Sequence, residues 1–254
     1  MPALASPAFQ RALSLWRSSR HTVVLTGAGS STPSGIPDFR SVGSGLWTRF
    51  LPMEVASLTA FQRQPERFFE WLRPLAHHML TAEPNAAHLA LAEAERKGKV
   101  QAIITQNIDG LHQRAGSRHV LEVHGTLSTM TCMGCYQQYA SDPFVPDYLE
   151  HGTIPRCPAC GQILKPDAIL FEEQLPATTW VAARQQASRC DLMIVLGSSL
   201  MVMPVAGLPL KAVENGARLI IINKTATYLD ERADAVLHAD VAEIVPALTR
   251  ELTS

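Results

Sequence analysis

Two Cys-x-x-Cys pairs are the most specific chemical signal in the chain. Cys132 and Cys135 form the first pair and Cys157 and Cys160 the second, with 21 residues (136–156) between them. Each pair can present two sulfurs to one metal, and four thiolates complete a tetrahedral zinc site. Because such a shell is closed to water, we expect this zinc to be structural rather than catalytic. Two disulfides or a redox pair are the alternatives, which a reducing compartment and the second copy of the motif disfavour.

A glycine-rich turn follows the first predicted strand. It reads Gly27-Ala28-Gly29-Ser30, and the chain runs on through Gly35-Ile36-Pro37 to Asp38-Phe39-Arg40. Glycines after a strand let backbone N–H groups approach a pyrophosphate, which the start of a helix also attracts. The glycines alone are weak evidence, since the sixth position is Thr32 and no acidic ribose partner follows the second strand. A plain strand-to-helix turn is the alternative, and the acid-aromatic-guanidinium tail argues against it.

Amide, carboxylate and imidazole groups follow two further predicted strands. Gln106-Asn107-Ile108-Asp109 follows one strand, and His124-Gly125 follows the next. The first cluster could bind a carboxamide and ribose hydroxyls. The pKa of an imidazole lies naturally near neutrality, so His124 is a candidate general base. A satisfied structural histidine is the alternative, and we adopt that interpretation for His112.

Short apolar runs that alternate with helical patterns position these groups. The pattern predicts an α/β fold, with a doubly wound, Rossmann-like parallel sheet, helices on both faces and a smaller zinc-binding domain inserted. Ligands bind beyond the carboxyl ends of such strands, so four polar clusters should share one rim: 27–30, 106–109, Gly197-Ser198-Ser199 and Asn223-Lys224-Thr225. The predicted strands are 22–26, the surroundings of 103–104, 121–123, 192–196 and 219–222; the predicted helices are 86–97, 177–187, 204–214 and 241–252.

Taken together and in this order, the motifs resemble those of the sirtuin family of NAD-dependent protein deacylases, bacterial type, from about residue 21 to residue 241. The resemblance implies a single catalytic unit with its reaction in a cleft between two domains. The large NAD-binding domain would comprise about 1–40, 85–127 and 172–254. The small domain would comprise 41–84, its helical part, and 128–171, its zinc module.

The resemblance also implies roles for individual residues. His124 would be the general base and Asn107 a second catalytic residue, and residues 31–48 would form a mobile lid. Ile169, Leu170 and Phe171 would pair with the substrate peptide, although the residues alone are equally typical of an ordinary strand. The implied NAD contacts are Gly27, Ala28, Gly29, Ser30, Asp38, Phe39, Arg40, Gln106, Asn107, Ile108, Asp109, Gly197, Ser198, Ser199, Asn223, Lys224 and Val241.

The reaction implied is the removal of acetyl or other neutral acyl groups from protein lysines, which produces nicotinamide, O-acyl-ADP-ribose and free lysine. Protein ADP-ribosylation or NAD hydrolysis at the same site is the alternative. A non-catalytic NAD-sensing or zinc-scaffold module is disfavoured, because a binder has no use for the set Asn107, Asp109 and His124. A dehydrogenase is disfavoured by the missing acidic ribose contact.

Three departures from the family pattern are visible. Phe171-Glu172-Glu173 stands where sirtuins usually have Phe-Gly-Glu, and Gly197-Ser198-Ser199 replaces the commoner Gly-Thr-Ser. Sirtuins that prefer acidic acyl groups carry a Tyr-x-x-Arg pair, whereas this chain reads Glu70-Trp71-Leu72-Arg73. We therefore expect neutral acyl groups, with Glu70 disfavouring succinyl groups.

Composition restricts the partners and the compartment. The chain has 254 residues, 46% hydrophobic, and a net charge of −1, which argues against nucleic acid or a membrane surface as a partner. The partners that the family resemblance implies are acylated-lysine proteins or peptides. Its apolar runs are too short to span a bilayer. The basic, serine-containing start loosely resembles a transit peptide, but Phe9, Ala12, Leu13 and Trp16 have the spacing of an amphipathic helix. We expect a first helix there and a cytoplasmic protein.

Overall fold

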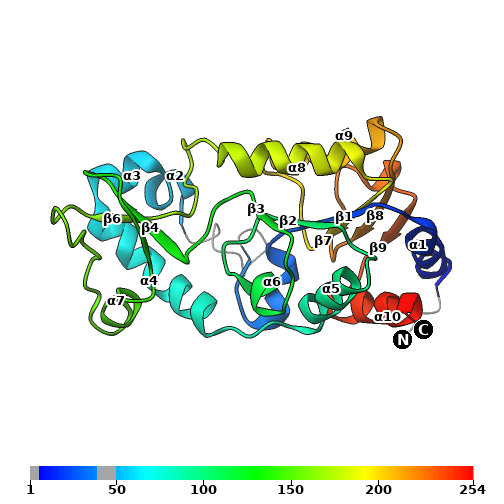
Figure 1. The fold of residues 1–254 in the computed structure, drawn as a ribbon, viewed down its shortest axis with the longest axis horizontal. Coiled ribbons are helices and arrows are strands. Elements are labelled where there is room, and N and C mark those ends of the chain that lie inside the picture. Colours follow the sequence, from blue (N-terminus) through cyan, green and yellow to red (C-terminus); the bar gives the residue numbers. More distant parts are fainter. Residues whose placement is uncertain (1–5, 39–49, 254) are drawn as a thin grey trace.

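A six-stranded parallel sheet forms the larger part of the molecule, in a computed structural model that describes residues 6–38 and 50–253 (Figure 1). The strand order is β3-β2-β1-β7-β8-β9 and all five pairings are parallel. This confirms the predicted doubly wound α/β fold. The strands are β1 (Thr22–Thr26), β2 (Ala102–Thr105), β3 (Val120–Glu122), β7 (Leu192–Leu196), β8 (Arg218–Ile222) and β9 (Ala235–Leu237). The sequence had not predicted the last strand.

Helices cover both faces of this sheet because its central strands are apolar on both sides. Val24 and Ile103 face one core, whereas Val23 and Leu25 face the other. Figure 1 shows α5 and α10 below the sheet and α8 and α9 above it. The first layer comprises α1 (Pro7–Ser18), α5 (Ala86–Arg96) and α10 (Val241–Thr253); the second comprises α8 (Ala177–Arg189) and α9 (Leu208–Glu214).

The helix boundaries follow from local capping. The Ser6 side chain accepts from Phe9 N and begins α1, and Asn85 forms a capping box with His88 at the start of α5. Phe9, Ala12, Leu13 and Trp16 are buried, which confirms the predicted first helix. The helix predicted over 204–214 is in fact a 3₁₀ turn, η5 (Val205–Gly207), followed by α9. The remaining short elements are η2 (Ala28–Ser30), η3 (Thr32–Ser34), α6 (Leu111–Arg114) and η6 (Asp230–Arg232).

A second unit of structure lies at the opposite end of the molecule from α1 and α10 (Figure 1). It contains a three-stranded antiparallel sheet, ordered β5-β4-β6, and an aromatic helical core around Phe61, Phe68 and Phe69. Its elements are α2 (Pro52–Val55), α3 (Leu58–Arg63), α4 (Pro65–Thr81), β4 (Thr129–Cys132), β5 (Gln138–Ala140), α7 (Val145–His151) and β6 (Leu164–Pro166). The sequence had indicated the cysteines of this unit but not its sheet.

Within the ranges 6–38 and 50–253, none of the helices combines the length and the apolar character needed to cross a membrane.

Candidate active site

The four polar clusters predicted along one rim do lie at the carboxyl ends of four neighbouring strands. They follow β2, β1, β7 and β8, which are adjacent in the sheet. The strand ladders continue into them, since Gln106 N donates to Thr26 O (3.0 Å) and Gly197 N donates to Ile222 O (3.0 Å). This part of the prediction is confirmed, and it gives a continuous polar edge at which a ligand can bind.

The glycine turn after β1 packs against the turn after β7. Gly29 N donates to Gly197 O at 2.8 Å, and Gly197 has a φ of +57°. A Cβ on Gly197 would lie 2.3 Å from Ser30 N, and one on Gly29 would lie 2.9 Å from Gly197 O. These glycines are therefore required by the contact between the two turns. Ala28 is half-buried, and its N–H, unlike those of Gly29 and Ser30, has no partner among the described residues.

Replacing Gly197 with alanine is expected to displace the turn at Ser30 and to strain residue 197 itself. We expect a cost of about 2 kcal/mol or more, from the left-handed backbone and the close contact, which is about 4–8 °C in Tm for a chain of this size. Gly207→Ala is the matched control, because a Cβ there meets only Met203 Cε at 3.6 Å. Equal melting temperatures for the two variants in calorimetry would contradict this interpretation.

Asn107 lies at the centre of a hydrogen-bond network beneath this turn. Its side chain is 9% exposed, and Nδ2 donates to Gly27 O (3.2 Å), Ser30 Oγ (3.2 Å) and Ser31 Oγ (3.0 Å). Because the Gly27 carbonyl can only accept, this edge of the amide must be Nδ2, and Oδ1 points away from the turn. Ser31 Oγ donates to Asp109 Oδ2 at 2.7 Å. The network fixes the amide and the carboxylate relative to each other.

Two buried histidines, His112 and its neighbour His88, lie next to this hydrogen-bond network. His112 lies 3.0 Å from Thr26 Oγ1, which donates to Thr105 Oγ1, and that hydroxyl accepts from Asn107 N at 3.1 Å. Burial lowers the pKa of His112 to about 3 and that of its neighbour His88 to about 4, so both rings are neutral at pH 7. His112 is thus a structural histidine, as predicted.

His124 is half-buried two residues after the end of β3, and a backbone contact fixes its tautomer. Nδ1 lies 3.1 Å from Gln106 O, and a carbonyl only accepts, so Nδ1 carries the proton and the lone pair lies on Nε2. The backbone of His124 is fixed as well, because its carbonyl accepts from Ile169 N at 2.8 Å. This tautomer is the one that a proton acceptor at Nε2 requires.

The predicted peptide segment, residues 169–171, lies beside His124 but is not a regular strand. β6 ends at Pro166, and Phe171 forms a single bridge with Ser57. The N–H groups of the segment are used within the chain: Ile169 N donates to His124 O, Leu170 N to Glu173 Oε2 and Phe171 N to Ala56 O. The carbonyls of Leu170 and Phe171 also accept within the chain, from Glu173 N and Leu58 N. The backbone hydrogen bonds of this segment are therefore largely satisfied within the chain.

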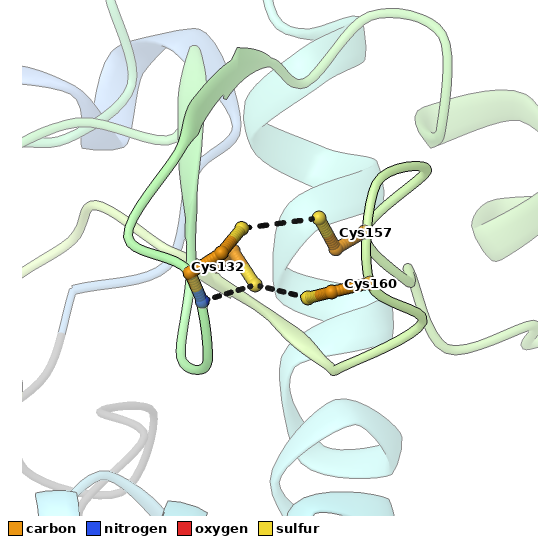
Figure 2. Close-up of side chains that lie close together, drawn as sticks. Cys132, Cys157 and Cys160 are labelled. Atoms are coloured by element: carbon orange, nitrogen blue, oxygen red, sulfur yellow. Dashed lines mark hydrogen bonds between the residues drawn. The ribbon is translucent and has the colours of Figure 1, made fainter.

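The four cysteines lie close together, as predicted. Figure 2 labels three of them, Cys132, Cys157 and Cys160. All their sulfurs are within 4.8 Å of one another, with 3.4 Å between Cys132 and Cys160 and 3.6 Å between Cys135 and Cys157. Four sulfurs about 2.3 Å from a tetrahedral zinc would be about 3.8 Å apart. The thiols are free, and the separations fit a Zn²⁺ with four thiolate ligands.

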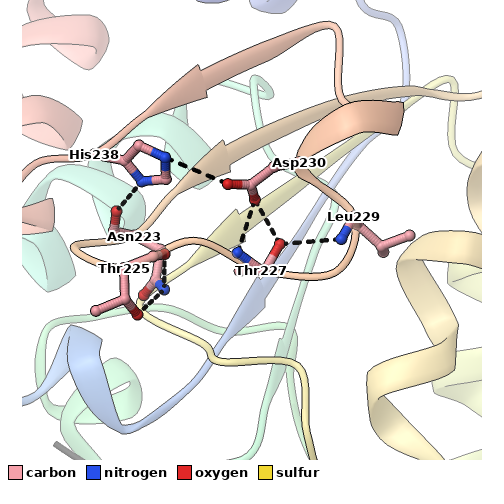
Figure 3. A network of polar contacts seen from close by, with 6 residues as sticks. All are labelled: Asn223, Thr225, Thr227, Leu229, Asp230 and His238. Atoms are coloured by element: carbon pink, nitrogen blue, oxygen red, sulfur yellow. Dashed lines mark hydrogen bonds and ion pairs between the residues drawn. The ribbon is translucent and has the colours of Figure 1, made fainter. Parts of the chain in front are cut away.

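A polar network supports the loop after β8 (Figure 3). Asn223 is 8% exposed, and its Nδ2 donates to Thr225 O at 2.8 Å. His238 lies 3.1 Å from Asn223 O and 3.3 Å from Asp230 Oδ2. Lys224 Nζ pairs with Asp240 Oδ2 at 2.8 Å. The predicted NAD contact Val241 is only 3% exposed, and its side chain packs in the core. The predicted contact from Val241 is thereby restricted to its backbone.

Two predicted NAD contacts, Phe39 and Arg40, lie outside the described residues, as does most of the predicted lid at 31–48. Asp38, Ile108 and Ser199 are described and half-buried. Ser31 was placed in the predicted lid and not among the site contacts, although it is a hydroxyl directly after the glycine turn and contacts Asn107 and Asp109. The sequence predicts Asn85 as the cap of the helix after it, which is confirmed. It does not predict that Asn85 Nδ2 donates to Ser30 O at 2.9 Å and so joins the cap of α5 to the turn.

Arg73, the half of the acid-selective pair that this chain retains, is engaged elsewhere. Arg73 Nη2 donates to Leu149 O and to Glu150 O, both at 2.7 Å, at the end of α7. Glu70, three residues earlier on α4, is exposed. The guanidinium is therefore committed to helix carbonyls rather than to an anion.

Comparison with known proteins is consistent with this geometry. The sequence profile of the Sir2 family matches residues 27–204. The chain is 45% identical over 244 residues to NAD-dependent protein deacylase 2 of Archaeoglobus fulgidus, covering 96% of this chain and 95% of the relative. It is 48% identical over 235 residues to NAD-dependent protein deacetylase 1 of Geobacillus kaustophilus, covering 92% and 94%.

Solved structures show the same fold with ligands. A Sir2 structure with a p53 peptide and NAD⁺ has a TM-score of 0.87 and 41% identity, covering 96% of this chain and 98% of that one. The structure of Sir2Af2 bound to a myristoylated histone peptide has a TM-score of 0.83 and 40% identity, covering 97% and 96%.

Proposed function

The chain belongs to the Sir2 family, and from this premise we propose that its site removes acetyl or other neutral acyl groups from protein lysines at the expense of NAD. The products are nicotinamide, O-acyl-ADP-ribose and free lysine. The observation that carries the proposal is the fixed tautomer of His124, whose Nδ1–H donates to Gln106 O while its backbone contacts the peptide segment. A proton acceptor is thus held between the NAD rim and the acyl-lysine site.

The polar rim fits NAD as co-substrate. We assign the phosphates to the turn 27–30, where Ala28 N–H is available, and the adenosine half to Gly197, Ser198, Ser199, Asn223, Lys224 and the backbone of Val241. Asp38, Phe39 and Arg40 would complete the phosphate and ribose contacts. When bound, NAD supplies a ribose carbon that loses nicotinamide readily and hydroxyl groups that accept the acyl group. Support for this assignment is the adjacency of the four clusters on neighbouring strands.

Asn107 and Asp109 have distinct tasks in this proposal. Asn107 directs Oδ1 away from the turn, so that it can accept from a ribose hydroxyl or a carboxamide, with Gln106 and Ile108 beside it. Asp109 accepts from Ser31 Oγ and Leu111 N and holds that arrangement. His124 takes up a proton at Nε2 when a ribose hydroxyl attacks the acyl group. The protein must exclude bulk water until then, because water would hydrolyse NAD directly.

The zinc and domain assignments follow the same proposal. Zinc bound by Cys132, Cys135, Cys157 and Cys160 is structural, since four thiolates close its shell. We assign 1–40, 85–127 and 172–254 to the NAD-binding domain, and 41–84 and 128–171 to the small domain. The cores around the large sheet and the zinc sheet each lie within one assigned domain and support this division. The aromatic core lies mainly in the small domain and also includes Ile36, Leu111 and Leu127 of the NAD-binding domain. Free thiolate ligands require a reducing compartment, and we therefore place the protein in the cytoplasm.

Succinyl-lysine is expected to be a poor substrate. Because Arg73 is committed to the carbonyls of α7, a succinyl carboxylate would enter the acyl site without a cationic partner. We expect kcat/KM to be about 10- to 100-fold lower for a succinyl peptide than for the same peptide carrying an acetyl group. A butyryl peptide controls for length without charge. Faster removal of succinyl than of acetyl groups would contradict the prediction.

The experiment that tests the function is quantitation of products from an acetylated peptide with and without NAD. Deacylation predicts nicotinamide and free lysine in a 1:1 ratio and no lysine without NAD. NAD hydrolysis would release nicotinamide without lysine, and ADP-ribosylation would add the mass of ADP-ribose to a protein. Either of those patterns would replace the proposal by the alternative function.

A further inference from the structure

Glu172 has a backbone conformation that its residue type rarely adopts. Its φ is +76°, in the left-handed region that glycine occupies without strain. The related family usually has glycine at this position, as described above, so the conformation is retained here with a side chain added. The backbone of a glutamate in this conformation is strained, and a favourable side-chain contact is needed to offset the energy of that strain.

The compensating contact is made with the start of α3. Glu172 Oε2 accepts from Thr59 N at 2.9 Å, within the first turn of the helix. This hydrogen bond holds the pKa of the Glu172 carboxyl below its usual value, with the Arg63 guanidinium as a lesser cause. The side chain is therefore ionised at neutral pH and forms a charge-assisted hydrogen bond to a helix N–H.

The hydrogen bond from Thr59 to Glu172 adds to two backbone hydrogen bonds between residues 56–58 and the peptide segment. Phe171 N donates to Ala56 O at 2.9 Å, and Leu58 N donates to Phe171 O at 3.0 Å. On the other side, Glu173 Oε2 accepts from Leu170 N at 2.8 Å and pairs with the buried Lys165 at 2.9 Å. Two consecutive carboxylates thus hold the peptide segment, one through α3 and the other through Leu170 N and Lys165.

The segment lies beside the candidate general base, because Ile169 N donates to the backbone carbonyl of His124. We propose that Glu172 is a positioning residue that fastens the peptide segment to α3 and presents it, already ordered, to the acyl-lysine substrate. This inference rests on the proposed deacylase function. Ordering the segment before binding lowers the entropic cost of binding the peptide, and it leaves the NAD rim unaffected.

The test compares Glu172→Gly and Glu172→Gln in steady-state kinetics. Glycine removes the side-chain contact without backbone strain, so KM for the acylated peptide should rise by about three- to tenfold, with kcat and KM for NAD within about twofold of the parent. Glutamine keeps an oxygen that can accept from Thr59 N and should restore most of the peptide KM. Glu83→Gly, at another exposed glutamate, is the control and should leave all three constants unchanged.

Hydrogen exchange supplies a second readout. In Glu172→Gly, amides of 56–61 should exchange faster, whereas those of β4 should not change. An unchanged peptide KM together with unchanged exchange at 56–61 would overturn the inference. A parent enzyme without NAD-dependent deacylation would instead overturn the proposed function, so the two failures are distinguishable.

Discussion

His124→Ala is expected to lower kcat for deacylation by about 10²–10⁴-fold, the usual contribution of a positioned general base. The reason is the loss of the proton acceptor at Nε2, whose tautomer is set by the contact between Nδ1 and Gln106 O. NAD affinity should change by less than about threefold, because the phosphate and adenosine contacts belong to other strands. Single-turnover kinetics and NAD titration by calorimetry measure the two effects separately.

The control for this variant is His119→Ala. His119 is exposed before β3 and contacts Gln101 O at 2.7 Å, at the opposite end of the strand from His124. Its replacement should change kcat by less than about twofold. If His124→Ala retained more than about a tenth of the parent kcat, another group would have to act as the base.

Removal of zinc is expected to abolish deacylation and to unfold the three-stranded sheet. Structural zinc sites contribute about 10–16 kcal/mol of apparent binding free energy, which a small core around Met130, Cys132 and Leu164 cannot replace. Cys160→Ser should have the same effect as a strong chelator. Metal analysis, together with hydrogen exchange of β4 and β5, measures occupancy and local unfolding.

Cys190→Ala is the matched control for the cysteine replacement. Cys190 is 5% exposed at the end of α8, and it is the one cysteine outside the cluster of four. This variant should retain one zinc per chain and full activity. Full activity of a metal-free enzyme would contradict a structural role for the cysteine cluster.

Local sequence patterns were sufficient to predict five of the six strands of the parallel sheet and its polar rim. β1 and β7 were predicted with the observed bounds, because buried parallel strands appear as short apolar runs that end in glycine turns. Parallel pairing then places the carboxyl ends of these strands at one edge of the sheet. This brings the four clusters together independently of the contacts that their side chains make. The cysteine spacing likewise predicted the cluster, since each pair already carries half of a tetrahedral site.

The contacts that depend on distant segments could not be predicted in this way. The Thr59–Glu172 hydrogen bond joins residues 113 positions apart, and Arg73 contacts Leu149 across 76 positions. The segment 169–171 resembles a strand in sequence, but its N–H groups are used by His124, Glu173 and Ala56. Such partners follow from the packing of segments that are distant in the chain, which residue spacing does not encode.

The most direct test of the central claim is the identity of the molecule that carries the acyl group after one turnover. We predict that rapid quenching and mass spectrometry will find it on ADP-ribose, equimolar with nicotinamide and free lysine. Release of the acyl group as a free carboxylate in the first turnover, with unmodified ADP-ribose, would show that water rather than a ribose hydroxyl attacks. That result would contradict the role assigned to His124.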